Sequence, residues 1–118
     1  MRWFRTGVVL LSVCACPLQV LAQGYPAKTV RIVVPFPPGG GVDATARIVG
    51  QKLSEQLGQP VIVDNRPGAA GTIGADFVAK AAPDGYTMLV AGPGAISVAS
   101  LVFSKLPYVP ARDFAPVT

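Results

Sequence analysis

The feature that most constrains the fold is an apolar run, a glycine-bearing loop and a helical pattern, in that order, three times over. The three apolar runs are residues 29–36, 59–65 and 86–92. Each is short and rich in β-branched or other apolar residues, as buried parallel strands are. Strands that alternate with helices build a parallel sheet with right-handed crossover connections. The sequence therefore predicts an α/β domain with βαβαβα order and a parallel sheet.

Apolar residues spaced by three and four indicate the helix faces that pack on this sheet. In the first helix they are Val42, Ala46, Val49, Leu53 and Leu57, with Gly58 placed to end the helix. In the second helix they are Ile73, Phe77 and Ala81, before the break at residues 83–85. A third, short helix is expected within residues 93–108.

The first 22 residues predict export. Arg2 and Arg5 precede an apolar stretch over residues 7–22, and residues 20–22 offer a cleavage site before Gln23. A membrane anchor is the alternative, but the stretch is shorter than the roughly 20 apolar residues of a spanning helix and contains Pro17. We therefore expect a signal peptide at residues 1–22 and a periplasmic mature chain.

Loss of the leader changes what the composition implies. Both cysteines, Cys14 and Cys16, lie within it, so neither a disulfide nor a cysteine metal ligand is expected afterwards. Lipidation of Cys16 is the alternative to cleavage after Ala22. The 10 basic residues include Arg2 and Arg5, so 8 remain against 6 acidic ones. They are scattered singly, and nucleic-acid binding is not expected. Residues 23–118 have the size of one small domain.

The three glycine-bearing loops are expected at one edge of the sheet, because parallel strands all end there. Open α/β sheets bind ligands at this edge. Helix N-termini at the edge present unpaired N–H groups and a partial positive charge, and glycine lets a ligand approach the backbone. Any one loop is equally consistent with a tight strand-to-helix turn. Three in succession favour a surface for an anion or another polar ligand.

A dinucleotide site is one form that such a surface takes. Gly39, Gly41 and Ala44 fit the pattern G-x-G-x-x-G/A, and Asp64 follows at the distance of a ribose-binding carboxylate. Against this, prolines interrupt the approach to Gly39, and Asp64 precedes residues 65–67, where a contact with a basic neighbour or with backbone amides is the alternative to ribose binding. A Rossmann-like oxidoreductase domain stays open as an alternative.

Five motifs in combination resemble the tripartite tricarboxylate transporter substrate-binding receptors, also called the Bordetella uptake gene family. They are PFPPGG at 35–40 followed by Asp43, NRPGAAG at 65–71, PDGYT at 83–87, LPY at 106–108 and DFAPV at 113–117. The resemblance extends over residues 25–118.

The resemblance implies a periplasmic receptor of two type II-like α/β lobes that close on a small carboxylate and deliver it to a membrane permease. It implies a monomer without enzymatic activity, cofactor, metal or membrane span. In the family, backbone amides of two first-lobe loops and ordered water bind the carboxylate. The positions that correspond here, with the third loop added, are Gly40, Gly41, Ala70, Gly71, Thr72, Gly92 and Gly94.

Two side chains near these amides have alternative roles. Asp43 would repel a carboxylate, so we expect it to hold the loop by accepting hydrogen bonds from backbone N–H groups; the alternative is recognition of a ligand ammonium or hydroxyl group. Thr72 is either a ligand hydroxyl or a helix N-cap.

The chain is much shorter than members of this family. Residues 23–118 are therefore expected to be an incomplete N-terminal lobe without the second lobe. This lobe alone is expected to bind carboxylates weakly. A lobe without function is the third alternative. The sequence contains no histidine, no G-x-S-x-G and no Walker motif, so the hydrolase and kinase templates do not apply.

Overall fold

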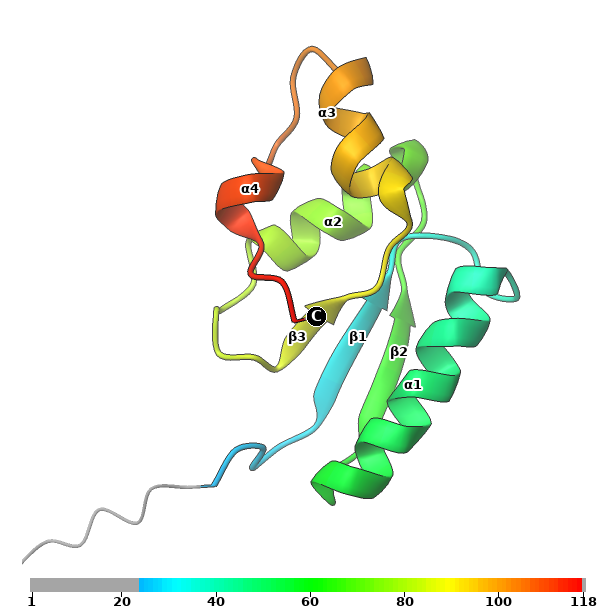
Figure 1. Cartoon of the computed structure of the whole chain (residues 1–118), viewed down its shortest axis with the longest axis vertical. Coiled ribbons are helices and arrows are strands. Elements are labelled where there is room, and N and C mark those ends of the chain that lie inside the picture. The colour runs from blue at the N-terminus through cyan, green and yellow to red at the C-terminus, as the bar shows by residue number, and fades with distance from the viewer. Residues whose placement is uncertain (1–23, 118) are drawn as a thin grey trace, which may run out of the picture.

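A computed structural model describes residues 24–117, which form a three-stranded parallel sheet with helices on both faces (Figure 1). The strands are β1 (Val30–Val34), β2 (Val61–Asn65) and β3 (Thr87–Leu89). Their order in the sheet is β2-β1-β3, so β1 is central. This confirms the predicted α/β fold and parallel sheet. The predicted signal peptide, residues 1–22, lies outside the described residues.

The helices divide between the two faces of the sheet. The helical segments are α1 (Gly41–Leu57), η1 (Ala69–Gly71), α2 (Thr72–Ala79), the π-helix η2 (Gly94–Val98), α3 (Ala99–Val102) and α4 (Pro110–Asp113). Helix α1 covers one face, and α2 lies on the other with the segment from η2 to α4 (Figure 1). Among residues 24–117, no helix is both long and apolar enough to cross a membrane.

The central strand β1 supplies most of the core. Val30, Ile32, Val33 and Val34 are buried almost completely, because β1 has a strand on each side and helices on both faces. This explains why its sequence is nearly continuous in apolar residues rather than alternating. The outer strand β3 is shorter than predicted, and its three residues are only half-buried.

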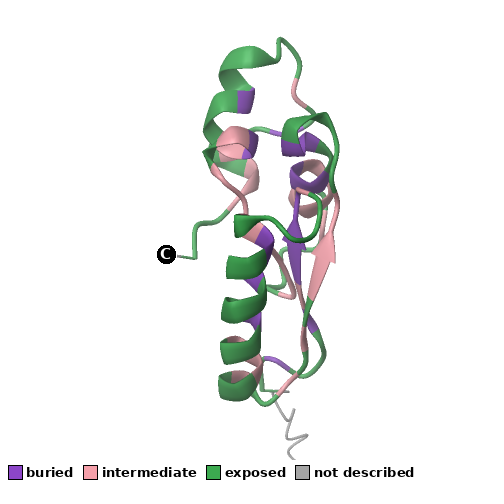
Figure 2. Ribbon diagram, turned by 90° about the vertical axis from the view of Figure 1, so that its right-hand side faces the viewer, coloured by how far each residue is buried: buried purple, intermediate pink, exposed green. Residues whose placement is uncertain are grey.

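Helix α1 packs through a slightly different stripe from the one predicted. Ala46 is buried, and Val42 and Leu53 pack on the same cluster, but Val49 is 43% exposed. The placement of Val49 on the buried face was wrong because the inward position belongs to Gly50, which is buried and faces side chains of β1 and β2. Figure 2 shows the exposed outer face and the buried inner face of α1. Gly58 ends the helix with a φ of 64°, as predicted.

Helix α2 also buries small residues in place of the large ones predicted. Ile73 is 54% exposed, and Ala81 lies beyond the end of the helix, whereas Gly74 and Ala75 are buried. A Cβ atom on Gly74 would lie 2.8 Å from Cβ of Pro35. Contact between α2 and the end of β1 is therefore so close that only the smallest residues fit, which turns the large side chains outward.

Candidate functional site at the carboxyl edge of the sheet

The strand order creates a crevice between the carboxyl ends of β1 and β3. The chain leaves β1 toward α1 on one face and leaves β3 toward η2 on the other (Figure 1). Such a switch point is where open α/β sheets bind ligands. A shallow depression of about 370 Å³ lies there. Its lining comes from the first turn of α1 and the segment after β3, namely Gly41, Val42, Thr45, Val90, Ala91 and Gly92.

The first turn of α1 borders this depression and has free backbone amides. Gly40 is the N-cap, with φ −81° and ψ 171°, and no side chain caps the helix. Within residues 24–117, the N–H groups of Gly40 and Gly41 find no hydrogen-bond acceptor, and both residues are exposed. Because α1 is 17 residues long, its dipole adds a partial positive charge at this end. The arrangement suits an anion.

The loop after β2 has an unusual backbone. Gly68, Ala69, Ala70 and Gly71 all have positive φ, with values of 133°, 46°, 55° and 92°. For alanine this region costs about 1–2 kcal/mol per residue, and such strain concentrates at binding sites and switch regions.

Several groups of this loop are already used within it. The Gly71 N–H donates to the carbonyl of Gly68 at 2.9 Å, and the Thr72 hydroxyl and N–H both donate to the carbonyl of Ala69. Thr72 is also buried, with only 8% of its surface exposed. Of the amides of Ala70, Gly71 and Thr72, that of Ala70 has no backbone acceptor in the described part of the chain. It is therefore the one that is free to bind a ligand.

Gly71 lies where the three loops meet. A Cβ atom placed on it would be 3.0 Å from Cβ of Ala95 in η2 and 3.4 Å from Cζ of Phe36 in the loop after β1. Gly92 and Gly94 flank the start of η2, and a Cβ on either would meet no atom within 4 Å. The structure thus brings all the glycines nominated from the sequence to one edge, some tightly packed and others open.

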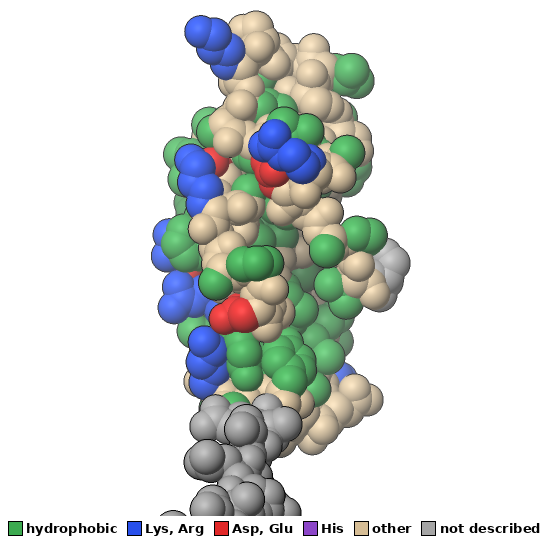
Figure 3. Space-filling view, turned by 90° about the vertical axis from the view of Figure 1, so that its left-hand side faces the viewer, with side chains coloured by type: hydrophobic (Ala, Val, Ile, Leu, Met, Phe, Trp, Pro, Cys, Tyr) green, Lys and Arg blue, Asp and Glu red, His purple; other side chains and the backbone are tan. Residues whose placement is uncertain are grey.

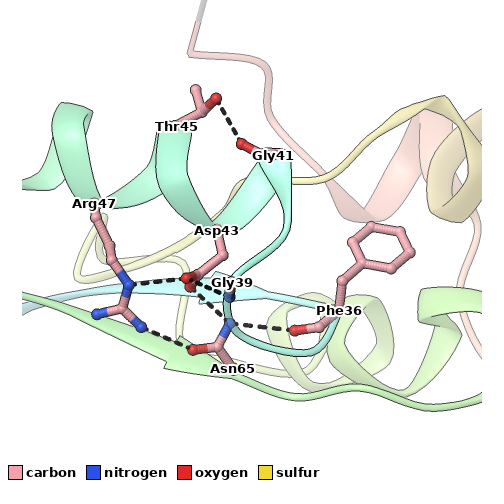
Figure 4. A network of polar contacts seen from close by, with 7 residues as sticks. All are labelled: Phe36, Gly39, Gly41, Asp43, Thr45, Arg47 and Asn65. Carbon is pink, nitrogen blue, oxygen red and sulfur yellow. Dashed lines mark hydrogen bonds and ion pairs between the residues drawn. The ribbon is translucent and has the colours of Figure 1, made fainter.

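Asp43 is the buried centre of a partly exposed hydrogen-bond network (Figure 4). Its Oδ2 accepts hydrogen bonds from the Gly39 N–H at 3.0 Å and from Nε of Arg47 at 2.9 Å. Its Oδ1 accepts one from Nδ2 of Asn65 at 2.9 Å. Asn65 also donates to the carbonyl of Phe36 at 3.2 Å and accepts from Nη2 of Arg47 at 3.3 Å. The contacts support the loop-holding interpretation of Asp43.

These donors also set the charge state of Asp43. The side chain of Arg47, then the N–H of Gly39 and the amide of Asn65, hold the pKa of the Asp43 carboxyl well below its ordinary value, against the opposing effect of burial. Asp43 is only 4% exposed. An ionised, fully partnered carboxylate is therefore fixed beneath the first loop rather than presented to solvent.

Arg47 and Asn65 were not among the residues nominated from the sequence. The spacing of Asp43 and Arg47 by four residues on one helix is a usable signal for their ion pair. No comparable signal links Asp43 to Asn65, which lies 22 residues away and on a different element.

Asp64, the carboxylate of the dinucleotide pattern, already has partners in the structure. Asp64 pairs with Nε of Arg66 at 2.9 Å and with Nη1 of Arg31 at 3.5 Å. Two arginines thus neutralise the carboxylate that would have bound a ribose. Among residues 24–117, no group of three or more acidic, cysteine or histidine side chains is arranged to hold a metal ion.

Basic side chains elsewhere on the surface are largely paired. Lys28 lies 3.4 Å from Asp84 and Lys80 lies 2.7 Å from Asp76. Figure 3 shows the Lys and Arg side chains on one face spread between apolar side chains, with acidic side chains beside some of them. Attraction of an anion to the carboxyl edge therefore depends on local amides more than on a basic patch.

Comparison with known proteins identifies the family. The family model of the tripartite tricarboxylate transporter family receptor matches residues 45–118. A UPF0065 protein of Bordetella bronchiseptica is 52% identical over 98% of this chain and 34% of its own length. Protein BugT of Bordetella pertussis is 40% identical over 93% of this chain and 34% of its own length. The chain spans about one third of the length of the curated relatives it matches.

Solved structures share the fold. MatC from Rhodopseudomonas palustris with bound malate is 45% identical, with a TM-score of 0.75 over 79% of this chain and 32% of that one. The periplasmic binding protein BugD is 38% identical, with a TM-score of 0.71 over 79% of this chain and 31% of that one. These matches account for the five motifs and the sheet topology together: the chain belongs to the tripartite tricarboxylate transporter receptor family.

Proposed function

We propose that this chain binds a small carboxylate at the carboxyl edge of its sheet, as a solute-binding component of a tripartite transporter, and that it catalyses no reaction. The observation that carries the proposal is the uncapped N-terminus of α1, which has free amides and whose first residue, Gly41, lines the depression between β1 and β3. Membership of a receptor family supports the same interpretation.

The proposed contacts are backbone amides rather than charged side chains. They come from three loops: Gly40, Gly41, Ala70, Gly71, Thr72, Gly92 and Gly94. An anion at a helix N-terminus gains about 0.3–1 kcal/mol, or up to ~2 when partly buried. The first loop is exposed, so water screens these attractions. We therefore expect a dissociation constant on the order of 1 mM, which corresponds to about 4 kcal/mol.

Malate is a suitable probe because a related receptor, MatC, was solved with malate bound. We propose malate as a test compound of the right chemical class, not as the natural ligand. A dicarboxylate can place one carboxylate at the start of α1 and direct the other toward the loop after β2.

The experiment is a titration of the ¹⁵N-labelled chain, followed by NMR, with malate, its uncharged diamide malamide, and NAD. The proposal predicts saturable shifts at the amides of Gly40, Gly41 and Ala70 with malate and none with malamide. Saturable shifts with NAD alone would favour the nucleotide alternative. Silence with all three would favour a lobe without function.

We further propose that the chain is exported as a periplasmic monomer, loses residues 1–22 and delivers its ligand to a membrane permease. The related protein BugD is a periplasmic binding protein, which supports this location. Intact mass spectrometry of periplasmic material should place Gln23 at the N-terminus. A mass that corresponds to diacylglyceryl on Cys16 would contradict the cleavage site.

A further inference from the structure

The side chain of Asn65 holds the loop after β1 through two hydrogen bonds. Asn65 is the last residue of β2, and its Nδ2 donates to the carbonyl of Phe36 and to Oδ1 of Asp43. Asp43 in turn accepts the N–H of Gly39. Phe36 and Gly39 are the ends of the segment that turns from β1 toward α1, so Asn65 fixes this turn at two points (Figure 4).

The same residue starts the second loop, and that loop is held in place immediately after it. The N–H of Arg66 donates to the carbonyl of Val34 at 2.8 Å, which continues the pairing with β1. The guanidinium of Arg66 lies 3.6 Å from the centre of the Phe77 ring in α2 and pairs with Asp64. The backbone of Asn65 therefore has little freedom, and its side chain carries that rigidity to the first loop.

We propose that Asn65 is a positioning residue that couples the two amide-bearing loops, with Asp43 and Arg47 as its partners. The effect of Asn65 on ligand binding rests on the proposed function. The coupling of the loops does not, because it exists without a ligand. The amides of Gly40 and Gly41 stay in register with those of the second loop because Asn65 prevents the first loop from moving independently.

The charge pattern of the network explains why an amide is required at position 65. Nδ2 of Asn65 must donate to a carboxylate and to a carbonyl, while Oδ1 must accept from Arg47. Alanine removes all three contacts. Aspartate keeps the shape but places a second carboxylate against Asp43, which is buried and ionised.

The test compares four variants of the full chain by amide hydrogen exchange and by malate titration. They are N65A, N65D, the exchange variant D43N/N65D, and Q51A as the matched control. Gln51 is also a primary amide and lines the same surface depression as Arg47, but it is exposed, and within residues 24–117 its side chain bonds only to Glu55. In the exchange variant, amide and carboxylate face each other again with their positions reversed, and only the donor to the Phe36 carbonyl is missing.

We expect the Gly39 amide to exchange at least about tenfold faster in N65A and faster still in N65D, because charge-assisted hydrogen bonds are lost. The exchange variant should recover much of the protection, and Q51A should match the wild type. In N65A, malate-induced shifts should weaken in both loops. A Gly39 exchange rate in N65A within about twofold of the wild-type rate would overturn the coupling, since the lost contacts contribute more than that.

Three further outcomes are decisive, and the second separates this proposal from the proposed function. If N65A does not fold, the comparison of N65D with D43N/N65D decides, and equal lability of the two would overturn the coupling. If the wild type shows no malate shifts, the proposed function fails, while the exchange rates still decide whether Asn65 couples the loops. Loops that loosen without any loss of malate affinity would overturn the positioning role.

Discussion

Each of the two sheet-packing helices has a buried glycine. Replacing it with alanine should raise the stability in one helix and lower it in the other. Gly50 in α1 and Gly74 in α2 both face the sheet. A Cβ on Gly50 would lie 3.5 Å from side-chain carbons of Ile32 and Val61, which is ordinary contact. A Cβ on Gly74 would lie 2.8 Å from Cβ of Pro35 and 2.9 Å from the Arg66 carbonyl oxygen, one of them backbone.

The free energies follow from these distances. In G50A, alanine gains up to about 1 kcal/mol of helix propensity, and burial of a methyl group adds about 0.8 kcal/mol. The variant should be more stable than the wild type by about 1–2 kcal/mol. In G74A, the propensity gain is outweighed by overpacking, which costs about 1–3 kcal/mol or more where backbone must move. Its net loss should be about 1–2 kcal/mol.

The assay is urea and thermal unfolding of the two variants and the wild type under the same conditions. A domain of this size shifts its Tm by about 4–8 °C per kcal/mol, so the two variants should differ by about 10 °C or more. The slope of unfolding free energy against urea should stay unchanged. If G74A were as stable as G50A, the close contact between α2 and the end of β1 would be absent, and the explanation for the exposure of Ile73 would fail.

Two further changes test the network and the core. The pKa of Asp43 is lowered in the folded state, chiefly by Arg47, so its stabilising contribution is fully present above its ordinary value of 3.8 and is lost progressively as the pH falls from there toward the lowered pKa. The stability difference between wild type and D43N should therefore shrink steadily as the pH falls below about 4, and a constant difference would contradict the role of the ionised form. Y108F removes the 2.5 Å hydrogen bond from the buried Tyr108 hydroxyl to the carbonyl of Ala95; it should lower the unfolding free energy by about 1–2 kcal/mol, and a neutral result in urea unfolding would show that water replaces the bond.

Much of the fold could be predicted because the local sequence patterns agree with the overall fold. The β-branched runs, the stripe of Ala46 and Leu53, and Gly58 at the end of α1 each specify their element from nearby residues. The errors at Val49 and at Ile73 have one cause. In both helices a glycine lies on the buried side, so a search for large apolar residues finds the wrong face.

The candidate site could be predicted only in part. Glycine-rich loops after strands indicate the correct edge, because topology alone brings strand ends together. The state of each amide could not be predicted: Gly71 donates within its own loop and packs against Ala95, while Gly41 is open. The contact between Asp43 and Asn65 joins two elements far apart in the sequence, and neither residue has a local pattern that reports it.

The central claim, that free amides at the start of α1 bind a carboxylate, is tested most directly by a matched pair of glycine substitutions. A Cβ on Gly41 or on Gly24 would meet no atom within 4 Å, and neither residue has a positive φ, so valine should be tolerated at both. Gly41 lines the depression, whereas Gly24 precedes β1 at the opposite end of the sheet. The measurement is malate affinity by NMR titration, with the Tm of each variant as the check on folding.

The account predicts that G41V weakens malate binding at least about fivefold, roughly 1 kcal/mol, because its methyl groups cover the amides of the first turn. G24V should bind as the wild type does, and all three proteins should unfold at the same temperature. Wild-type affinity in a fully folded G41V would contradict the central claim.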